Sequence, residues 1–228
     1  MPSGHKVVSG KAGVASEQKK ITIEQQTKKA VVEWGDFSIA YGEKVEILQP
    51  SKGAAILNRV VGDNISKIYG ALESNGKAYL LNQNGIVIGP EGRIDTAGFI
   101  ASTLDISNQE FLFGKDVVFK GDSEAGITNL GRIKIHSGDL FLLARQVENY
   151  GVLSSGEGVV GVIGTSELLL KEEVNDRVYI RPNSERSILN EGTIKDIEDV
   201  LKGAGGNAYS LPLNQKGLVH AQGVHPSI

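Results

Sequence analysis

Apolar and polar residues alternate with a period of two along many short stretches of this chain. The alternation is clearest in residues 20–24, 44–47, 132–136 and 177–181. Such a period predicts short strands that each bury one face. A helical period is scarce, and only residues 63–72 and 197–202 are candidates for a helix of a few turns. The pattern therefore predicts an all-β chain.

A sequence repeat indicates how these strands are arranged. The pattern Asn-x-Gly-x-apolar occurs three times, with spacings of 20 and 41 residues between the asparagines. We interpret these spacings as one period and about two periods. A variant begins at Asn214, 24 residues further on. The repeated corner residues are Asn129 and Gly131, Asn149 and Gly151, and Asn190 and Gly192.

A unit of about 20 residues with short strands cannot bury its own apolar face, so it must stack on its neighbours. The repeat therefore predicts a parallel β-helix. Asparagine at each corner would tolerate left-handed backbone angles and form side-chain ladders, and glycine would let the next strand start sharply. A β-sandwich with Asn-Gly hairpins is the alternative. A leucine-rich repeat is disfavoured because its Leu-x-x-Leu-x-Leu core does not recur.

The first fifty residues lack this repeat but contain predicted strands and the single Trp34. An uncovered end of a β-helix is a template for edge-to-edge association, and repeat proteins need caps for this reason. We therefore expect one domain over residues 1–228. Its N-terminal cap strands would occupy about residues 1–50, and its β-helix coils about residues 51–228.

Composition excludes several classes of function. The net charge is −3 and the basic residues are scattered, so no footprint for nucleic acid is visible. The chain has no Cys, which excludes disulfides and thiolate metal sites. Its longest apolar runs, such as residues 140–144, are far shorter than the ~20 residues of a membrane-spanning helix. The 29 glycines fit frequent turns between short strands.

The two ends of the chain suggest that it is part of a longer protein. No basic and then apolar segment follows Met1, so a signal peptide is absent from this sequence. We expect a mature fragment with an added start codon. Residues 217–221 look like the start of another coil, so we expect the solenoid to continue beyond Ile228.

Several motifs resemble one known family, in order and spacing, over about residues 5–225. Asn82-Gln83-Asn84-Gly85-Ile86 is similar to the Asn-Pro-Asn-Gly-Ile motif of the haemagglutination activity domain. The likeness extends to residues 34–39, 57–60, 70–77, 97–107 and 206–211. This family is the secretion domain of two-partner exoproteins, such as filamentous haemagglutinin and the high-molecular-weight adhesins. Gln83 stands where proline is typical, and residues 48–51 stand where some branches have Asn-Pro-Asn-Leu.

The resemblance implies a right-handed parallel β-helix with an N-terminal cap and extra-helical strands. It also implies a targeting role within a large exoprotein, such as an adhesin. After inner-membrane export, the polypeptide-transport-associated domains of an outer-membrane two-partner transporter would recognise the domain in the periplasm. The domain, a monomer, would then fold outside the cell and nucleate the next coils. The exoprotein would be secreted or held at the cell surface, and the missing passenger would contact host cells.

The same motifs supply the candidate site residues. They are Asn58 and Arg59 together with Asn82, Gln83, Asn84, Gly85 and Ile86. Residues 82–86 would be both a secretion motif and a tight corner that shapes a coil, and we expect their direct role to be structural. Asn58 and Arg59 are interpreted in the same way, as a buried polar corner.

Catalysis and ligand binding are the alternative functions. Pectinolytic β-helix enzymes need acidic or basic residues stacked on adjacent coils, and the aspartates here do not recur at the repeat spacing. The four histidines form no i, i+4 pair. We therefore assign no catalytic residue, no cofactor and no metal site. The other alternative is a stand-alone module that binds host glycans or haem proteins, but the thinly spread aromatic residues indicate no exposed stripe.

Overall fold

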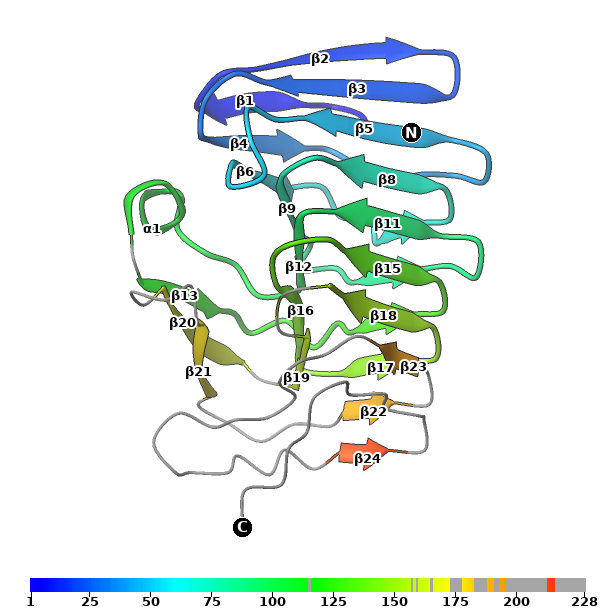
Figure 1. Ribbon diagram of the computed structural model, residues 1–228, viewed down its shortest axis with the longest axis vertical. Coiled ribbons are helices and arrows are strands. Elements are labelled where there is room, and N and C mark those ends of the chain that lie inside the picture. Colours follow the sequence, from blue (N-terminus) through cyan, green and yellow to red (C-terminus); the bar gives the residue numbers. More distant parts are fainter. Residues whose placement is uncertain are drawn as a thin grey trace.

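A computed structural model describes residues 1–114, 116–156, 158, 160–164, 166–172, 178–182, 188–190, 193–195 and 213–215. Within these residues the chain is nearly all β, with one short helix, α1 (Asn108–Phe113). The strands form three long sheets that wind around a common core, and a fourth, small sheet lies outside them (Figure 1). The all-β prediction is confirmed.

The three long sheets are named here by number, with their strands in spatial order. Sheet I holds β2 (Ala12–Glu17), β3 (Lys20–Gln25), β5 (Lys44–Leu48), β8 (Ala71–Ser74), β11 (Arg93–Thr96), β15 (Arg132–Ile135), β18 (Val152–Ser155) and β23 (Thr193–Lys195). Sheet II holds β1 (Lys6–Ser9), β4 (Lys29–Trp34), β6 (Ala55–Val60), β9 (Lys77–Leu81), β12 (Gly98–Ser102), β16 (Leu140–Ala144) and β19 (Val160–Gly164). Sheet III holds β7 (Ser66–Ile68), β10 (Ile86–Ile88), β14 (Ile127–Asn129), β17 (Val147–Asn149), β22 (Ile188–Asn190) and β24 (Leu213–Gln215).

The chain visits the sheets in the order I, II, III, and each complete circuit is one coil. From β3 onward, successive coils pair strand on strand in parallel; for example β5, β8 and β11 are neighbours in sheet I. This is the parallel β-helix that the repeat predicted. The β-sandwich alternative is excluded because hairpin-connected sheets would be antiparallel.

The register in which the strands pair shows that the 41-residue spacing does not correspond to two coils. Asn149 lies directly opposite Asn190 on the adjacent strand, so this spacing is one coil and not two. The extra residues leave the helix between β19 and β22 and contain β20 (Glu167–Glu172) and β21 (Val178–Pro182). Asn190 lies opposite Gln215, so the variant at Asn214 is one residue out of step with the repeat.

The core explains why the Asn-Gly repeat is visible only in the later coils. One interior column at the corner between sheets III and I contains Ile39, Ile68, Ile88, Asn129 and Asn149, which are paired in register. All five side chains are fully buried. The first three coils thus use isoleucine where the later coils use asparagine. The coils therefore begin well before the motif that reveals them in the sequence.

Antiparallel strands close the N-terminal end of the helix. β2 lies antiparallel on β3, and β1 lies antiparallel on β4, although β3 and β4 already pair in parallel with the next coil. The antiparallel part of the cap is therefore residues 6–17. The antiparallel pairing satisfies the backbone N–H and C=O groups on the outer edges of β3 and β4. Without it, these edges would be open to pairing with other chains.

Extra-helical elements cover the outer face of sheet II. α1, β13 (Asp116–Lys120), β20 and β21 leave the helix after β12 and after β19, and they lie side by side on one flank of the solenoid (Figure 1). Phe111, Phe119 and Leu168 pack from these elements against outward-facing Leu57 and Phe141. Burial on both faces explains why this sheet has continuous apolar runs in place of alternation. The extra-helical strands implied by the family resemblance are confirmed.

The helix expected at residues 63–72 is wrong. This segment contains β7 and the start of β8, separated by the corner at Tyr69 and Gly70. Ile68 and Leu72 both point into the core from two different strands, so the corner places them four residues apart and imitates a helical period. Residues 197–202, the other helix candidate, lie outside the described residues.

Candidate functional site

The motif at residues 82–86 forms the turn between sheets II and III. The Gly85 N–H donates to the Asn82 carbonyl at 3.1 Å, which closes a four-residue turn. The buried Asn82 side chain donates from Nδ2 to the Asn64 carbonyl at 2.8 Å and to Ser66 Oγ at 3.0 Å. Asn82 Oδ1 accepts from the Asn84 N–H at 2.9 Å. Asn82 therefore ties the turn to the preceding coil from inside.

Gly85 and Ile86 return the chain to the core. Gly85 has φ +114°, a backbone conformation that residues with a side chain rarely adopt. The Ile86 side chain is fully buried in the main core. Gln83 and Asn84 are the exposed members of the motif, and Asn84 Nδ2 donates to the Gly62 carbonyl at 2.7 Å.

Asn58 and Arg59 lie on β6 and not at a corner, and they point to opposite faces of sheet II. Asn58 is buried inside the helix, where Oδ1 accepts from Trp34 Nε1 at 3.1 Å and Nδ2 donates to the Tyr79 carbonyl at 3.2 Å. Trp34 also packs edge-on against Phe37. Asn58 therefore satisfies the only polar atom of the largest buried side chain in the first coils.

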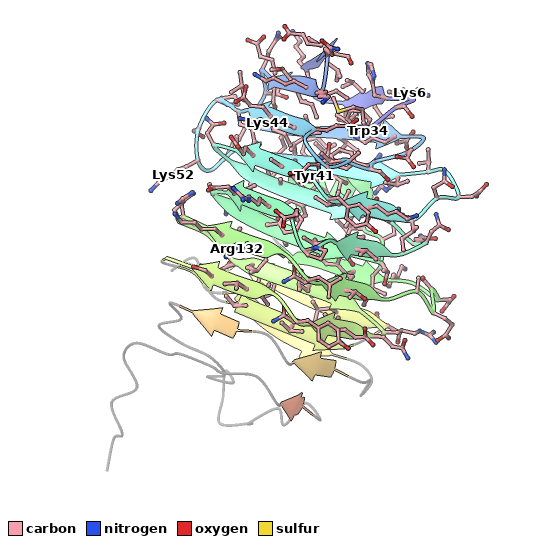
Figure 2. The ribbon with its side chains drawn as sticks, turned by 90° about the vertical axis from the view of Figure 1, so that its right-hand side faces the viewer. Lys6, Trp34, Tyr41, Lys44, Lys52 and Arg132 are labelled. Atoms are coloured by element: carbon pink, nitrogen blue, oxygen red, sulfur yellow. The ribbon has the colours of Figure 1, made fainter. Side chains whose placement is uncertain are left out.

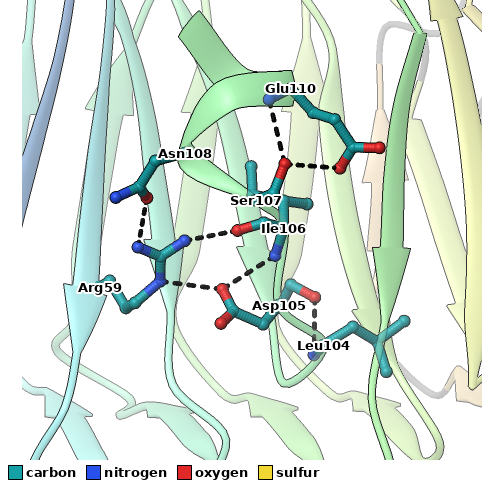
Figure 3. A network of polar contacts seen from close by, with 8 residues as sticks. Arg59, Leu104, Asp105, Ile106, Ser107, Asn108 and Glu110 are labelled. Carbon is teal, nitrogen blue, oxygen red and sulfur yellow. Dashed lines mark hydrogen bonds and ion pairs between the residues drawn. The ribbon is translucent and has the colours of Figure 1, made fainter. Parts of the chain in front are cut away.

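Arg59 points outward and fastens the extra-helical segment to sheet II (Figure 3). Its Nε donates to Asp105 Oδ1 at 2.9 Å, and its two terminal nitrogens donate to Asn108 Oδ1 and to the Ile106 carbonyl, each at 2.5 Å. Ser107 then caps α1, because its Oγ accepts from the Glu110 N–H at 3.0 Å. Sequence reasoning missed this cluster, although Ser-x-x-Glu is a helix-capping signal.

The motif turn and Arg59 border the same surface hollow. Its walls come from the end of β6, the motif turn and the start of the extra-helical segment. The lining residues are Arg59, Val60, Val61, Gly62, Asp63, Leu81, Gln83, Asn84 and Asp105. The structure thus brings together two motifs that are separated in sequence.

The segment at residues 48–51 also builds a polar corner. Gln49 is buried, and its Nε2 donates to Gln25 Oε1 of the preceding coil at 2.7 Å. The Ser74 hydroxyl of the following coil donates to Gln49 Oε1 at 2.5 Å. Asn75 exchanges two hydrogen bonds with the Gln49 backbone. A three-coil ladder of side chains therefore stands where other branches of the family have Asn-Pro-Asn-Leu.

The repeated Asn and Gly residues form the corner between sheets III and I. Asn129 Nδ2 donates to Asn149 Oδ1 at 2.7 Å, which is the predicted ladder, and Asn129 Oδ1 accepts from the Gly131 N–H at 3.1 Å. Neither asparagine has a positive φ, so these corners do not use the tolerance of asparagine for left-handed backbone angles. Glycine is required for a different reason. A Cβ on Gly151 would lie 2.2 Å from the Gly131 carbonyl oxygen of the preceding coil.

The corner at Asn190 and Gly192 is only partly described. Asn190 continues the column opposite Asn149, whereas Gly192 lies outside the described residues. Residues 206–211, which contribute to the family resemblance, also lie outside them.

The described residues contain no group of three or more His, Asp or Glu side chains that could hold a metal ion. His136 pairs with Asp95 on an exposed surface of sheet I. Ser102, on β12, accepts from the Leu104 N–H at 2.9 Å, so its hydroxyl shapes a corner.

Comparison with known proteins gives the family. The family model of the TPS secretion domain matches residues 1–225. The chain belongs to the two-partner secretion (TPS) domain family. The crystal structure of the HMW1 secretion domain from Haemophilus influenzae is similar, with a TM-score of 0.74 and 31% sequence identity, over 85% of this chain and 53% of that one. This family is a secretion family and not a catalytic one.

Two curated relatives are similar to part of this TPS domain. Both are heme/hemopexin-binding proteins of Haemophilus influenzae, 41% and 40% identical over 106 residues, or 46% of this chain. The chain spans only 12% and 11% of their length. As a member of this family, the chain is a secretion domain, and its role is to target an exoprotein for secretion.

Proposed function

We propose that this TPS domain is recognised in the periplasm by an outer-membrane transporter, through the transporter's polypeptide-transport-associated domains. We further propose that the domain folds outside the cell and nucleates the coils that follow. The observation that carries this proposal is the directional architecture. Antiparallel β1 and β2 close one end, and each later coil adds parallel strands to the coil before it.

Coil stacking gives a physical basis for nucleation. Each coil buries apolar surface only against a neighbour that is already formed, at ~25 cal/mol per Å². Stability is then roughly nearest-neighbour, and growth from a formed end is favoured. The closed N-terminal end supplies such a formed end. Folding of successive coils on the far side of the membrane would bias the passage of the chain outward without ATP.

The motif at residues 82–86 acts in this proposal mainly through structure. In the folded domain Asn82 and Ile86 are buried and Gly85 has no side chain, so a partner could contact these side chains only before the domain folds. Only Gln83 and Asn84 are exposed, beside the hollow that Arg59 borders. We expect loss of export after mutation of Asn82 to reflect failure of this corner to form as the chain folds outside the cell.

The location and the host-directed activity follow from the same proposal. The exoprotein passes through the periplasm and is secreted or retained at the cell surface. In the described part of the chain, no helix has the length and apolar character needed to cross a membrane. Because the relatives named for heme and hemopexin binding are far longer than this domain, we place adhesion or haem-protein capture in the passenger.

Export is the experiment that tests the proposal. The TPS domain is given a signal peptide and expressed in a Gram-negative host with or without its neighbouring transporter. We expect the domain in the medium only when the transporter is present. A transporter that is inactive but still inserted serves as the control for membrane leakage. Retention in the periplasm beside a functional transporter would contradict the proposal and favour a stand-alone binding module.

A further inference from the structure

The corner between sheets III and I carries an exposed column that the sequence does not reveal. Tyr69, Leu130 and Tyr150 each follow the last residue of a sheet III strand, and their backbone N–H groups donate to the preceding coil. They are 40%, 40% and 39% exposed. In the first coil Ala40 takes the equivalent position after Ile39, and the next residue, Tyr41, is 77% exposed at the same corner. Irregular spacing in the sequence hides this alignment, because insertions and loops of different length separate the coils.

The column is nearly continuous because of a glycine. Gly89 occupies the position of the coil between Tyr69 and Leu130. A Cβ on Gly89 would lie 2.1 Å from Tyr69 Cδ1, so the tyrosine ring covers the surface that a side chain there would occupy. The exposed ring of Tyr69 is thus held against the backbone of the following coil.

Two arginines flank this column on sheet I. Arg93 and Arg132 are exposed, begin β11 and β15, and lie opposite each other in parallel register. Among the described residues, neither has an ion pair or a hydrogen bond from its side chain. Figure 2 looks onto this corner, with Tyr41, Lys44 and Arg132 labelled on the viewer's side.

Basic residues elsewhere on this sheet behave differently. Lys44 binds Glu46 at 3.1 Å and Glu73 at 2.6 Å, and Lys20 binds Glu46 at 2.8 Å. The hydrogen bond from Lys20 is the main reason why the pKa of Glu46 lies below its ordinary value. Like charges directly opposite each other on adjacent strands are destabilising, and an external anion bound between the two guanidinium groups would offset their repulsion.

We propose that this Tyr–Arg corner, formed by Tyr41, Tyr69, Leu130, Tyr150, Arg93 and Arg132, binds an anionic polysaccharide that lies along the helix axis. The tyrosine rings would pack against sugar rings, and the planar guanidinium groups would bind carboxylate or sulfate groups in two-pronged fashion. Successive rungs are ~4.8 Å apart along the axis, so a polymer with a regular repeat can use several of them.

A peptide or a lipid surface fits this corner less well. Peptides that add to a sheet need unpaired backbone groups. Here the N–H groups of Tyr69, Leu130 and Tyr150 are already bonded to the neighbouring coil. A membrane-bound helix buries a broad apolar face, whereas this column offers at most one partly covered side chain per coil. Repetition along the axis is the feature that favours a polysaccharide.

The test measures binding of the purified 228-residue domain to immobilised polymers at physiological salt. The probes are oligogalacturonate, dextran sulfate, neutral dextran and poly-L-glutamate. We expect binding to one or both acidic polysaccharides, with little binding to neutral dextran or poly-L-glutamate. The double variant Arg93→Ala/Arg132→Ala should weaken binding by roughly tenfold or more. Its melting temperature reports whether the fold is retained.

Two matched variants make the result specific. Lys28→Ala/Lys52→Ala removes the same charge from exposed residues at a different corner and should leave binding unchanged. Arg93→Lys/Arg132→Lys keeps the charge but removes the planar guanidinium groups. It should still weaken binding, because lysine cannot bind a carboxylate or sulfate through two parallel hydrogen bonds. Equal loss in the Lys28/Lys52 variant, full binding by the Arg-to-Lys variant, or equal binding of poly-L-glutamate would overturn the proposal. Because binding is measured on the folded domain, the result is independent of export.

Discussion

At the scale of single residues, the motif turn explains why proline is typical where this chain has Gln83. Gln83 is the second residue of the turn that Asn82 and Gly85 close. Proline is favoured at this place because its fixed φ matches the turn. Within the described residues the Gln83 N–H donates no hydrogen bond, so replacing it removes none. The family motif is therefore a turn motif, and glutamine is a tolerated departure from it.

We expect Gln83→Pro to stabilise the domain by about 0.4–1 kcal/mol, because proline restricts the unfolded chain more than the folded one. Urea unfolding followed by circular dichroism measures the change. Asn82→Ala is the matched comparison and should destabilise by about 1–3 kcal/mol, since it removes buried hydrogen bonds to Asn64 and Ser66. A destabilised Gln83→Pro variant would show that the turn needs the Gln83 N–H or another backbone angle.

At the scale of elements, Arg59 is the point at which the extra-helical segment is attached. It binds three groups on residues 105–108, and its side chain is 13% exposed against 38% for Asp105. Solvent screening weakens the ionic part of these contacts, but the directional hydrogen bonds to the Ile106 carbonyl and Asn108 remain. The β-helix itself does not use these contacts, because Arg59 faces away from the core.

Arg59→Ala should therefore release residues 105–113 while the coils stay folded. We expect a loss of about 1–3 kcal/mol and new protease cleavage within this segment. Limited proteolysis with mass spectrometry identifies the site, and circular dichroism checks the β-sheet content. Asn108→Ala, which loses one of the three contacts, is the milder control. Cleavage within sheets I or III instead would contradict a local role for Arg59.

Elements also show where sequence reasoning succeeded and where it failed. Asn129 and Asn149 revealed the coils, because a polar residue repeated in a buried corner is easily seen. Ile39, Ile68 and Ile88 occupy the same column but look like any other core residue. The extra-helical strands were placed only by family resemblance, since their insertion made one coil look like two. Partners of Arg59 could not be predicted, because they lie 46–49 residues away in the sequence.

At the scale of the whole molecule, the β-helix is a one-dimensional stack with unequal ends. Its N-terminal coil is covered by β1 and β2, and every later coil rests on the coil before it. Equivalent substitutions at the two ends should therefore have different kinetic effects. Ile23 of β3 and Leu153 of β18 make a matched pair, because both are fully buried and both point into the core from sheet I.

We expect Ile23→Ala and Leu153→Ala each to destabilise by about 2–5 kcal/mol, through lost burial and the cavity left behind. If folding starts at the capped end, Ile23→Ala slows refolding, whereas Leu153→Ala mainly speeds unfolding. Stopped-flow refolding and unfolding in urea separate the two effects, and hydrogen exchange should show Leu153→Ala opening β17 and β18 while β3 to β9 stay protected. Slower refolding of Leu153→Ala alone would place the nucleus at the other end. Folding outside the cell could then begin only after the whole domain had crossed, and nucleation by the N-terminal coils would have to be abandoned.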